Sequence, residues 1–322
     1  MSQHQVTVTR RLPAPIEAQL GQRYRAVLNP DDAPFSPKAL RAALTGSDAV
    51  VVTVTDRIDA AMLQDCRARI IANYGVGLDH IDLAAAAKAG IVVINTPGAL
   101  TDATAELAFT LMLMTARRAG EGERLVRSGK WTGWAPTQLV GRSLDGATLG
   151  IVGMGRIGRA TAVRAARGCG MKIMYWSRSA LADGLMGGVP VERVESLDDL
   201  LQRADVVSLH TPATPETHHL IDARRLALLR PNAILINTAR GPVVDEAALV
   251  DALERGRLMA AGLDVYEREP TVHPGLLQLE QAVLLPHLGS ATETARIAMG
   301  NTVLCNLEAF FAGKAPPDRV TS

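Results

Sequence analysis

The sequence lacks an excess of charge of either sign. Its 322 residues include 34 Lys and Arg against 33 Asp and Glu, so the formal net charge is +1. Proteins that bind nucleic acid or an anionic membrane surface usually carry a strongly basic balance or basic clusters. The composition therefore gives no reason to expect either partner.

Cysteines and long apolar runs are also scarce. Cys66, Cys169 and Cys305 are widely separated and form no Cys-x-x-Cys pair, so we expect neither a disulfide scaffold nor a metal site. The most apolar helical stretch, 105–116, is too short to span a bilayer and contains Glu106. The first twenty residues have no apolar segment of the kind found in signal peptides. These absences predict a cytoplasmic protein.

Aromatic residues make up only 3% of the sequence, whereas hydrophobic residues as a whole make up 48%. The cores must therefore be built mainly from Ala, Val, Leu and Ile. A chain of 322 residues also exceeds the usual size of one domain. The composition thus predicts two globular domains with aliphatic cores.

Short apolar runs alternate with helical stretches in both halves of the chain. Strands are predicted at 49–54, 70–74 and 91–94, and then at 148–152, 172–176, 206–209, 234–237, 260–263 and 283–285. Strands that alternate with helices indicate parallel βαβ units. A long helical pattern from about 102 to 127 and a helical tail, 290–313, connect the two series. We therefore expect an α/β fold of two Rossmann-like, doubly wound parallel-sheet domains.

A Gly-x-Gly-x-x-Gly motif follows the first strand of the second series and opens a helix; its glycines are Gly153, Gly155 and Gly158. The motif alone is a weak signal, but this strand–turn–helix context is typical of dinucleotide-binding domains. The first glycine permits a tight turn, the second lets a pyrophosphate approach the backbone, and the third lets the helix pack closely. The amides of Arg156 and Ile157, at the helix start, would face the phosphates. The alternative is a glycine-rich turn without a ligand.

The end of the following strand indicates which dinucleotide binds. NAD-dependent enzymes carry Asp or Glu about 20 residues after the motif, where the acid binds the ribose hydroxyls. Here the residues are Ser177, Arg178 and Ser179, with no acid before Asp183. Hydroxyls and a guanidinium would bind a 2′-phosphate through charge-assisted hydrogen bonds. We predict NADP(H) as the preferred cofactor; if Arg178 is only a solvated cation, the protein accepts NAD(H) as well.

Three polar segments, 237–241, 264–270 and 286–290, follow successive strands of the second series. Open parallel sheets bind ligands at the carboxyl ends of their strands. Reduction of a 2-keto acid needs a cation for the carboxylate, a task that suits the planar guanidinium of Arg240. It also needs a proton donor, and His287 suits this because histidine exchanges a proton near neutral pH. A buried Glu269 would stand behind the histidine and favour its charged form.

Each of these three residues also has a simpler explanation. A histidine after a strand is often a hydrogen-bonded core residue, and an Arg or Glu in a loop is usually a solvated surface charge. Their order after a dinucleotide motif favours the catalytic interpretation. The two α/β series joined by two long helices predict that the chain crosses twice between two domains. We therefore expect a dinucleotide-binding domain, 102–288, inserted into a discontinuous, flavodoxin-like substrate-binding domain, 1–101 and 289–322.

The chain resembles the D-isomer-specific 2-hydroxyacid dehydrogenases over nearly its whole length. Within that family it is most similar to the NADPH-dependent glyoxylate/hydroxypyruvate reductases. The matching segments are 74–82, 152–158, 209–212 with Thr217, 237–241, 264–270 and 286–292. The resemblance implies reduction of a small 2-keto acid of the glyoxylate/hydroxypyruvate class to the D-2-hydroxy acid.

The resemblance also implies roles for individual residues. Arg240, Glu269 and His287 form the catalytic set, as the residues themselves suggest. The backbone N–H groups of Val76 and Gly77 hold the substrate carboxylate, although 75–77 is also explained as a plain strand-to-helix turn. Further residues implied to contact the substrate or the cofactor, in addition to the catalytic set, are Ser290 beside the histidine, Thr238 and Ala239 at the nicotinamide, Thr104 near the phosphates, and Thr211, Pro212 and Thr217.

Two implied roles leave alternatives open. Asp264 matches a carboxylate near the nicotinamide amide, but an Asp at this place also caps turns or helices. Trp134 resembles a tryptophan that, in some reductases, reaches across a homodimer interface into the partner's site. Its alternative is a plain interface anchor. Both interpretations of Trp134 predict a homodimer.

Three other functions remain as alternatives. Another D-2-hydroxyacid dehydrogenase activity, such as 2-ketogluconate reduction, would use the same catalytic set. A non-enzymatic, NAD(P)-sensing corepressor would keep the glycines but would not need Arg240, Glu269 and His287. Oxidation of formate or phosphite on the same scaffold would need an additional site for a very small anion, and no motif demands one.

Overall fold

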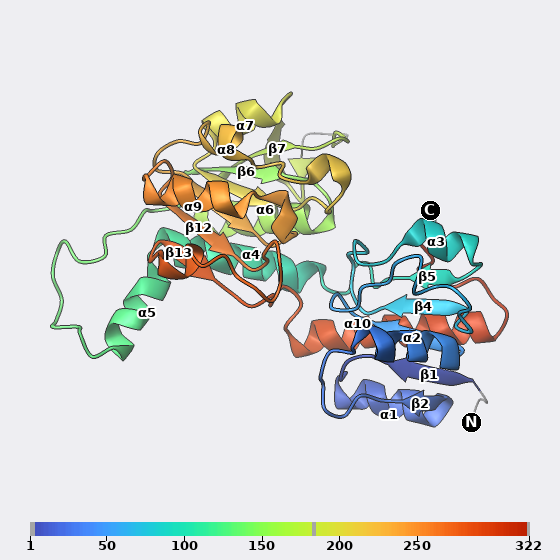
Figure 1. Ribbon diagram of the computed structural model, residues 1–322. Coiled ribbons are helices and arrows are strands. Elements are labelled where there is room, and N and C mark those ends of the chain that lie inside the picture. The colour runs from blue at the N-terminus through green and yellow to red at the C-terminus, as the bar shows by residue number, and fades with distance from the viewer. Residues whose placement is uncertain (1–3, 182–184, 321–322) are drawn as a thin grey trace. The chain divides into compact units, whose positions relative to one another are not determined.

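The computed structural model describes residues 4–181 and 185–320, and the chain divides into two compact units (Figure 1). Unit 1 comprises residues 1–100 together with 290–322, and unit 2 comprises residues 101–289. Each unit is a parallel sheet with helices on both faces. The predicted fold class, two doubly wound parallel-sheet α/β domains, is confirmed.

Unit 1 contains a five-stranded sheet in the order β2-β1-β3-β4-β5, in which all neighbours are parallel. Every residue of β3 and β4 is buried, because helices cover both faces of a parallel sheet. The strands are β1 (Gln5–Val8), β2 (Arg25–Val27), β3 (Ala49–Val52), β4 (Ile70–Asn73) and β5 (Val92–Ile94).

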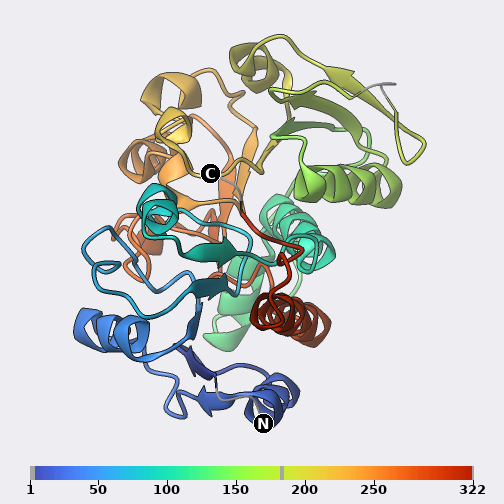
Figure 2. The ribbon, with the colours of Figure 1, turned by 90° about the vertical axis from the view of Figure 1, so that its right-hand side faces the viewer.

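The two faces of this sheet are covered by different helices. Helices α1 (Ala14–Arg23) and α10 (Glu293–Phe311) share one core with β1, β3 and β4, and Figure 2 shows α10 lying beside this sheet. Helices α2 (Pro37–Gly46) and α3 (Leu83–Lys88) enclose the opposite core. The C-terminal helix therefore completes a unit that begins with the N-terminal strand.

Unit 2 contains an eight-stranded sheet in the order β13-β12-β11-β10-β6-β7-β9-β8. All pairs are parallel except β8 with β9, which form a hairpin at one edge. The strand order reverses direction between β6 and β10, and such a switch point is where doubly wound sheets bind ligands. The strands are β6 (Thr148–Val152), β7 (Lys172–Trp176), β8 (Leu185–Met186), β9 (Val189–Arg193), β10 (Val206–Leu209), β11 (Ile234–Asn237), β12 (Ala260–Leu263) and β13 (Ala282–Leu284).

Helices also cover both faces of the unit 2 sheet. Helices α4 (Thr101–Ala116) and α6 (Arg156–Cys169) pack on one face. The other face is covered by α7 (Leu197–Arg203), α8 (Ala223–Leu226) and α9 (Glu246–Glu254). Short 3₁₀ turns occupy η1 (Pro215–Thr217), η2 (Gly241–Val243) and η3 (Leu276–Gln278).

Side-chain caps specify where many of these helices begin. Each capping oxygen accepts a hydrogen bond from a backbone N–H of the first turn, where the helix itself supplies no acceptor. The capped helices and their caps are α2 with Ser36, α3 with Asp82, α7 with Ser196, α8 with Asp222, α9 with Asp245 and α10 with Thr292.

The helix predicted from 102 to 127 is wrong in its continuity. The structure has α4 and a separate helix, α5 (Ala119–Arg127), with a break at Arg118. Arg118 has a φ of 52°, a left-handed conformation that an α-helix cannot continue through. The break lets α5 leave the sheet on which α4 packs (Figure 1).

Helix α5 and the loop that follows it form an exposed arm, residues 119–142. No residue of α5 is buried. The arm nevertheless carries large apolar side chains, with Val126 58%, Trp131 52%, Trp134 82% and Val140 64% exposed. Of the helices that the structure describes, none combines the length and the apolar run needed to cross a membrane.

Candidate active site

The turn between β6 and α6 combines obligatory glycines with an open helix start. Gly153 has a φ of 98°, and a Cβ there would lie 2.7 Å from the carbonyl oxygen of His210. A Cβ on Gly158 would lie 2.2 Å from the carbonyl oxygen of Gly153. A Cβ on Gly155, by contrast, would meet no described atom within 4 Å, and no side chain caps α6. The turn therefore presents open space in front of the first amides of α6.

Two buried hydroxyls lie near this turn at the carboxyl ends of neighbouring strands. Thr211 follows β10 and Thr238 follows β11, and Oγ1 of each is buried without a hydrogen-bond partner among residues 4–181 and 185–320. Buried polar atoms are normally paired, and a polar ligand bound at the carboxyl ends of these strands would give both hydroxyls a partner. Together with the glycine turn at the switch point, they fit a bound dinucleotide.

The residues predicted to bind the ribose end of the cofactor follow β7 and are Ser177, Arg178 and Ser179. Ser177 is partly buried, whereas Arg178 is exposed. The pKa of Glu216, in η1, is lowered by a hydrogen bond from the Thr214 hydroxyl and further by the charge of Arg178. An acid therefore lies near the predicted phosphate-binding cation. Asp183 lies outside the described residues.

The turn after β11 directs Arg240. The side-chain nitrogen of Asn237 donates to the carbonyl of Arg240 over 2.9 Å, and its side-chain oxygen accepts from the amide of Ala239 over 3.0 Å. A Cβ on Gly241 would lie 1.8 Å from the carbonyl carbon of Tyr266, so only glycine fits this close approach. The guanidinium of Arg240 is partly buried and donates to the carbonyl of Ala239 over 2.8 Å.

Asp264 holds the turn that carries His287. Its two carboxylate oxygens accept hydrogen bonds from the amides of Leu288 and Gly289 over 2.7 and 2.8 Å, and its carbonyl accepts from the amide of His287 over 2.9 Å. His287 has a φ of 55°, which the turn maintains. Asp264 has no exposed surface, and this burial raises its pKa. These contacts match the capping alternative; a role near the nicotinamide stays a prediction.

His287 and Glu269 form a side-chain pair. Nδ1 of His287 lies 2.8 Å from Oε2 of Glu269, and Oε1 of Glu269 accepts from the amide of Tyr266 over 3.0 Å. The side chains are 31% and 32% exposed, so the expectation that Glu269 is buried is wrong. Glu269 follows β12 and His287 follows β13, so both lie at the carboxyl ends of strands, where parallel sheets bind their ligands.

The charge state of Glu269 follows from its neighbours. Partial burial by itself would raise the pKa of Glu269. The hydrogen bond and charge of His287, together with the charge of Arg240, outweigh burial and lower the pKa overall. Glu269 is therefore a carboxylate at neutral pH, so Nδ1 of His287 donates the hydrogen bond between them. The structure thus brings Arg240, Glu269 and His287 together.

In unit 1, the turn 75–77 follows β4. The side-chain nitrogen of Asn73 donates to the carbonyls of Gly75 and Gly77 over 3.1 and 2.8 Å, and that of Asn95 donates to the carbonyl of Val76 over 2.9 Å. The amides of Val76 and Gly77 donate to no acceptor within the described part of the chain. Adjacent free amides with their carbonyls turned away form an anion-binding surface.

The remaining predicted residues have contacts of their own. Thr104 is buried, and its hydroxyl donates to the carbonyl of Gly289 over 2.8 Å, so it supports the turn that carries His287. Thr217 donates to the carbonyl of Pro212 over 2.7 Å and closes the loop after β10. Ser290 is partly buried and begins the second segment of unit 1.

His210 is a functional candidate that the sequence analysis did not single out. Burial lowers its pKa to about 4, so the ring is neutral at pH 7. Its Nε2 lies 2.9 Å from the hydroxyl of Ser208, and its carbonyl is the group that Gly153 approaches. The residue therefore supports the glycine turn. Its position directly after a predicted strand was the available signal.

Comparison with known proteins now decides the family. Residues 109–289, more than half of the chain, match the family described as "D-isomer specific 2-hydroxyacid dehydrogenase, NAD binding domain". The chain belongs to the D-isomer specific 2-hydroxyacid dehydrogenases. This confirms the family predicted from the sequence.

Individual relatives extend the similarity beyond the residues that the family model matches. A glyoxylate reductase of Thermococcus litoralis is 50% identical over 278 residues, which cover 85% of this chain and 83% of that protein. Another, from Thermococcus onnurineus, is 43% identical and covers 98% of this chain and 95% of its own length. The crystal structure of an NADPH-dependent glyoxylate/hydroxypyruvate reductase from Sinorhizobium meliloti, in complex with NADP and malonate, has a TM-score of 0.87 at 33% identity and covers 99% of this chain and 97% of that one.

As a D-isomer specific 2-hydroxyacid dehydrogenase, the protein is an oxidoreductase that uses a nicotinamide dinucleotide and acts on small 2-keto or 2-hydroxy acids. The glycine turn and the orphaned hydroxyls are the features of unit 2 that fit this cofactor. Among the described residues, no group of three or more His, Cys, Asp or Glu side chains is arranged to hold a metal ion.

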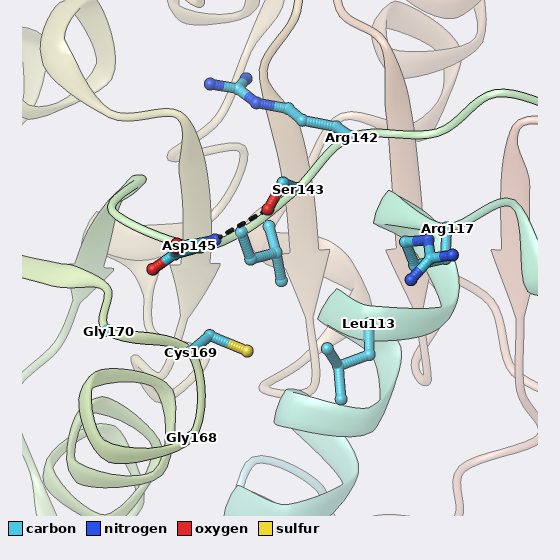
Figure 3. Close-up of a pocket in the computed structure, with 9 residues that line it drawn as sticks. Leu113, Arg117, Arg142, Ser143, Asp145, Gly168, Cys169 and Gly170 are labelled. Atoms are coloured by element: carbon cyan, nitrogen blue, oxygen red, sulfur yellow. Dashed lines mark hydrogen bonds between the residues drawn. The ribbon is translucent and has the colours of Figure 1, made fainter.

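A cavity of about 420 Å³ in unit 2 lies apart from these residues (Figure 3). It is lined by Leu113 of α4, by Arg117 just after that helix, by the loop 142–145 and by 168–170 at the end of α6. These segments precede β6 and β7, whereas the glycine turn follows the carboxyl end of β6. The cavity therefore lies at the opposite end of the strands from the candidate active site.

Proposed function

We propose that the protein reduces glyoxylate to glycolate and hydroxypyruvate to D-glycerate, with NADPH as the preferred reductant. The observation that carries the proposal is the His287–Glu269 pair beside Arg240, at the carboxyl end of the sheet that also bears the glycine turn. Relatives named glyoxylate reductase, up to 50% identical, support the choice of substrate.

His287 is the proposed proton donor. Its Nδ1 is engaged by the Glu269 carboxylate, which leaves the Nε2–H of the charged ring for the keto oxygen of the substrate. The reduced nicotinamide supplies the hydride when it is bound. As the carbonyl carbon becomes tetrahedral, the proton on Nε2 passes to the developing alkoxide and the ring becomes neutral. Acid–base help of this kind typically contributes about a hundred- to ten-thousand-fold in rate.

Arg240 and the turn 75–77 are the proposed partners of the substrate carboxylate. The guanidinium of Arg240 keeps its charge and binds both carboxylate oxygens with parallel N–H groups. The free amides of Val76 and Gly77 supply further donors. Unit 1 is accordingly the proposed substrate-binding domain. Ser290, next to the turn of His287 in sequence, is proposed to contact the substrate.

Unit 2 is the proposed cofactor-binding domain. The amides of Arg156 and Ile157 begin α6 without a side-chain cap and would hold the pyrophosphate. The hydroxyls of Thr211 and Thr238 would find partners on the cofactor, and Ala239, Pro212, Thr217, Thr104 and Asp264 are proposed to shape its surroundings. Ser177, Arg178 and Ser179 are the proposed 2′-phosphate site, which is the basis for preferring NADPH.

A homodimer is proposed from the exposed arm, residues 119–142. The arm has no buried residue in α5 yet exposes Trp131, Trp134 and Val126 by more than half. A large apolar surface of this kind is normally covered in the working protein. A second copy would cover it, and Trp134 would then lie in the interface, where it either anchors the partner or reaches its site.

One experiment tests the proposed function directly. Initial rates of reduction are measured for glyoxylate, hydroxypyruvate and 2-ketogluconate, each with NADPH and with NADH. The rate of formate oxidation is measured with NADP⁺ and with NAD⁺. We expect the highest kcat/KM for the two short keto acids with NADPH. A clear preference for 2-ketogluconate, activity on formate, or no turnover of any acid would each replace the proposal by one of its alternatives.

A further inference from the structure

Three segments of unit 2 meet at Glu267, two residues before Glu269. Oε1 of Glu267 lies 2.5 Å from Nε2 of His219, which belongs to the loop after β10. The amide of Glu267 donates to Oε1 of Glu246 over 2.6 Å, at the start of α9. In return, the amide of Glu246 donates to Oε2 of Glu267 over 3.4 Å. One side chain therefore ties together the loop after β10, the start of α9 and the segment that carries Glu269.

Acidic side chains surround His219 in this cluster. Glu246 is only 5% exposed, and burial raises its pKa; the nearby charge of Glu267 acts in the same direction. His219 lies between two of the acids, since its Nε2 contacts Glu267 and its Nδ1 lies 3.9 Å from the carboxylate of Asp245.

The same cluster fixes the segment that follows Arg240. The amide of His219 donates to the carbonyl of Pro242 over 2.8 Å. On the other side, a Cβ on Gly241 would lie 2.3 Å from the amide nitrogen of Glu267, so the two backbones are in direct contact. The turn after Arg240 is therefore held between the backbone of Glu267 and the loop of His219.

The backbone of His219 supports a specific role for its side chain. His219 has a φ of 48°, a conformation that is uncommon for residues other than glycine. The neighbouring ring of His218 stacks on it with centroids 4.0 Å apart but is itself exposed. The residue with the uncommon backbone conformation is therefore the one whose ring contacts Glu267. The neighbouring His218 provides a control substitution of the same residue type.

We propose that Glu267 and His219 form a positioning pair that holds Arg240 in register with Glu269 and His287, and thereby sets the affinity for the substrate carboxylate. The inference rests on the proposed role of Arg240 as the carboxylate-binding residue. Glu267 and His219 act through Arg240 and need no contact with the reacting atoms. They are specificity-supporting residues that the catalytic set alone does not include.

The test compares Glu267→Ala, Glu267→Gln and His218→Ala with the unaltered protein. Steady-state kinetics with glyoxylate give KM and kcat, quenching of protein fluorescence gives the NADPH Kd, and thermal unfolding gives Tm. For Glu267→Ala we expect KM to rise about tenfold, the loss typical of a hydrogen bond to a charged group, with kcat and the NADPH Kd changed by less than about threefold. Glu267→Gln, whose amide oxygen still accepts hydrogen bonds, should recover most of the KM. His218→Ala should leave KM unchanged.

A double-variant comparison separates positioning from general loss of stability. If Glu267 acts through Arg240, then Glu267→Ala should raise KM much less in an Arg240→Ala background than in the unaltered protein. A purely structural role would lower Tm in both backgrounds without this coupling. If Glu267→Ala does not fold, His219→Gln takes its place in the same comparison.

The outcomes distinguish the inference from the proposed function. An unchanged KM in Glu267→Ala, or a fall in kcat with KM unaffected, would overturn the positioning role. If Arg240→Ala itself leaves KM unchanged, the fault lies in the proposed function. If Arg240→Ala raises KM and Glu267→Ala does not, only the inference fails.

Discussion

Units 1 and 2 share a parallel-sheet architecture but present different chemistry at the carboxyl ends of their strands. Unit 2 presents side chains, namely those of Arg240, Glu269 and His287. Unit 1 presents the backbone amides of Val76 and Gly77. A side-chain group is removed by almost any substitution, whereas a backbone amide is removed only by proline. The proposed side-chain contacts of unit 2 are therefore sensitive to most substitutions, whereas the proposed backbone contacts of unit 1 are sensitive only to proline.

The difference arises from which backbone groups the supporting side chains occupy. In unit 1, Asn73 and Asn95 donate to three carbonyls and so leave the adjacent amides free. In unit 2, Asp264 accepts from two amides of the turn after β13 and so fixes the backbone from which His287 projects. Similar polar residues thus prepare an amide site in one unit and a side-chain site in the other.

The largest effect is expected at the side-chain site of unit 2. His287→Gln keeps a polar side chain but cannot donate the proton, so kcat should fall by about a hundred- to ten-thousand-fold. The NADPH Kd, which depends on the glycine turn, should change by less than about threefold. Steady-state and fluorescence titrations measure the two quantities. His4→Gln, at a histidine that stacks on Phe311 in unit 1, is the control. A variant that retained its kcat would remove His287 from the mechanism.

A second test addresses the side chains of unit 2 that are proposed to read the cofactor. Arg178→Ala should weaken NADPH binding by about ten- to a hundredfold and leave NADH nearly unchanged, since only NADPH carries the 2′-phosphate. Glu216→Gln is expected to have the opposite effect on NADPH binding, because Glu216 lies near Arg178 and its negative charge would repel the 2′-phosphate. It should tighten NADPH binding. Equal losses of both cofactors in Arg178→Ala would argue against a 2′-phosphate site there.

A third test sharpens the comparison on the side of unit 1. Val76→Ala keeps the backbone N–H and should leave the substrate KM within about twofold. Val76→Pro removes the N–H and should raise KM by about tenfold. Circular dichroism and Tm establish that both variants fold. If alanine and proline behave alike, the amide does not bind the carboxylate, and unit 1 contributes through something other than its backbone.

The strands were largely predictable because helices bury both sheets. Strands covered on both faces are continuous apolar runs, so 70–74 and 234–237 match β4 and β11 to within a residue. The hairpin β8–β9 was missed because Pro190, Glu192 and Arg193 interrupt its apolar pattern at the sheet edge. The break between α4 and α5 was missed because Arg118 adopts its left-handed conformation without a glycine to signal it.

The candidate site was predictable where chemistry and chain order coincide. The glycine motif and the order Arg240, Glu269, His287 are visible in the sequence because each follows a strand of the same sheet. The pair of Glu267 with His219 was not, because 48 residues separate its members and the contact depends on the path of two loops. The free amides of Val76 and Gly77 likewise depend on the hydrogen bonds of the Asn73 side chain, which no local sequence pattern predicts.

The last expected effect concerns stability in acid rather than activity and is specific to unit 2. Burial lowers the pKa of His210 from 6.5 to about 4, so the unfolded chain binds this proton more tightly than the folded one. The resulting stabilisation is complete above pH 6.5 and is lost as the pH falls toward 4. Its full size is on the order of 3 kcal/mol. His210→Gln does not titrate and can still bond the hydroxyl of Ser208, so it should lack this loss.

Hydrogen exchange at pH 7 and pH 5 locates the effect. Acidification should lower the protection factors of amides in β6 and β10, after correction for the intrinsic pH dependence of exchange, more in the unaltered protein than in His210→Gln, because only the former has to protonate a buried ring. The amides of β3 and β4 in unit 1 should respond equally in both proteins. If the variant and the unaltered protein lose protection in parallel throughout, His210 is not the acid-sensitive group. Packing alone would then stabilise the glycine turn. The two units would differ only in the turns proposed to bind the substrate and the cofactor, not in their stability in acid.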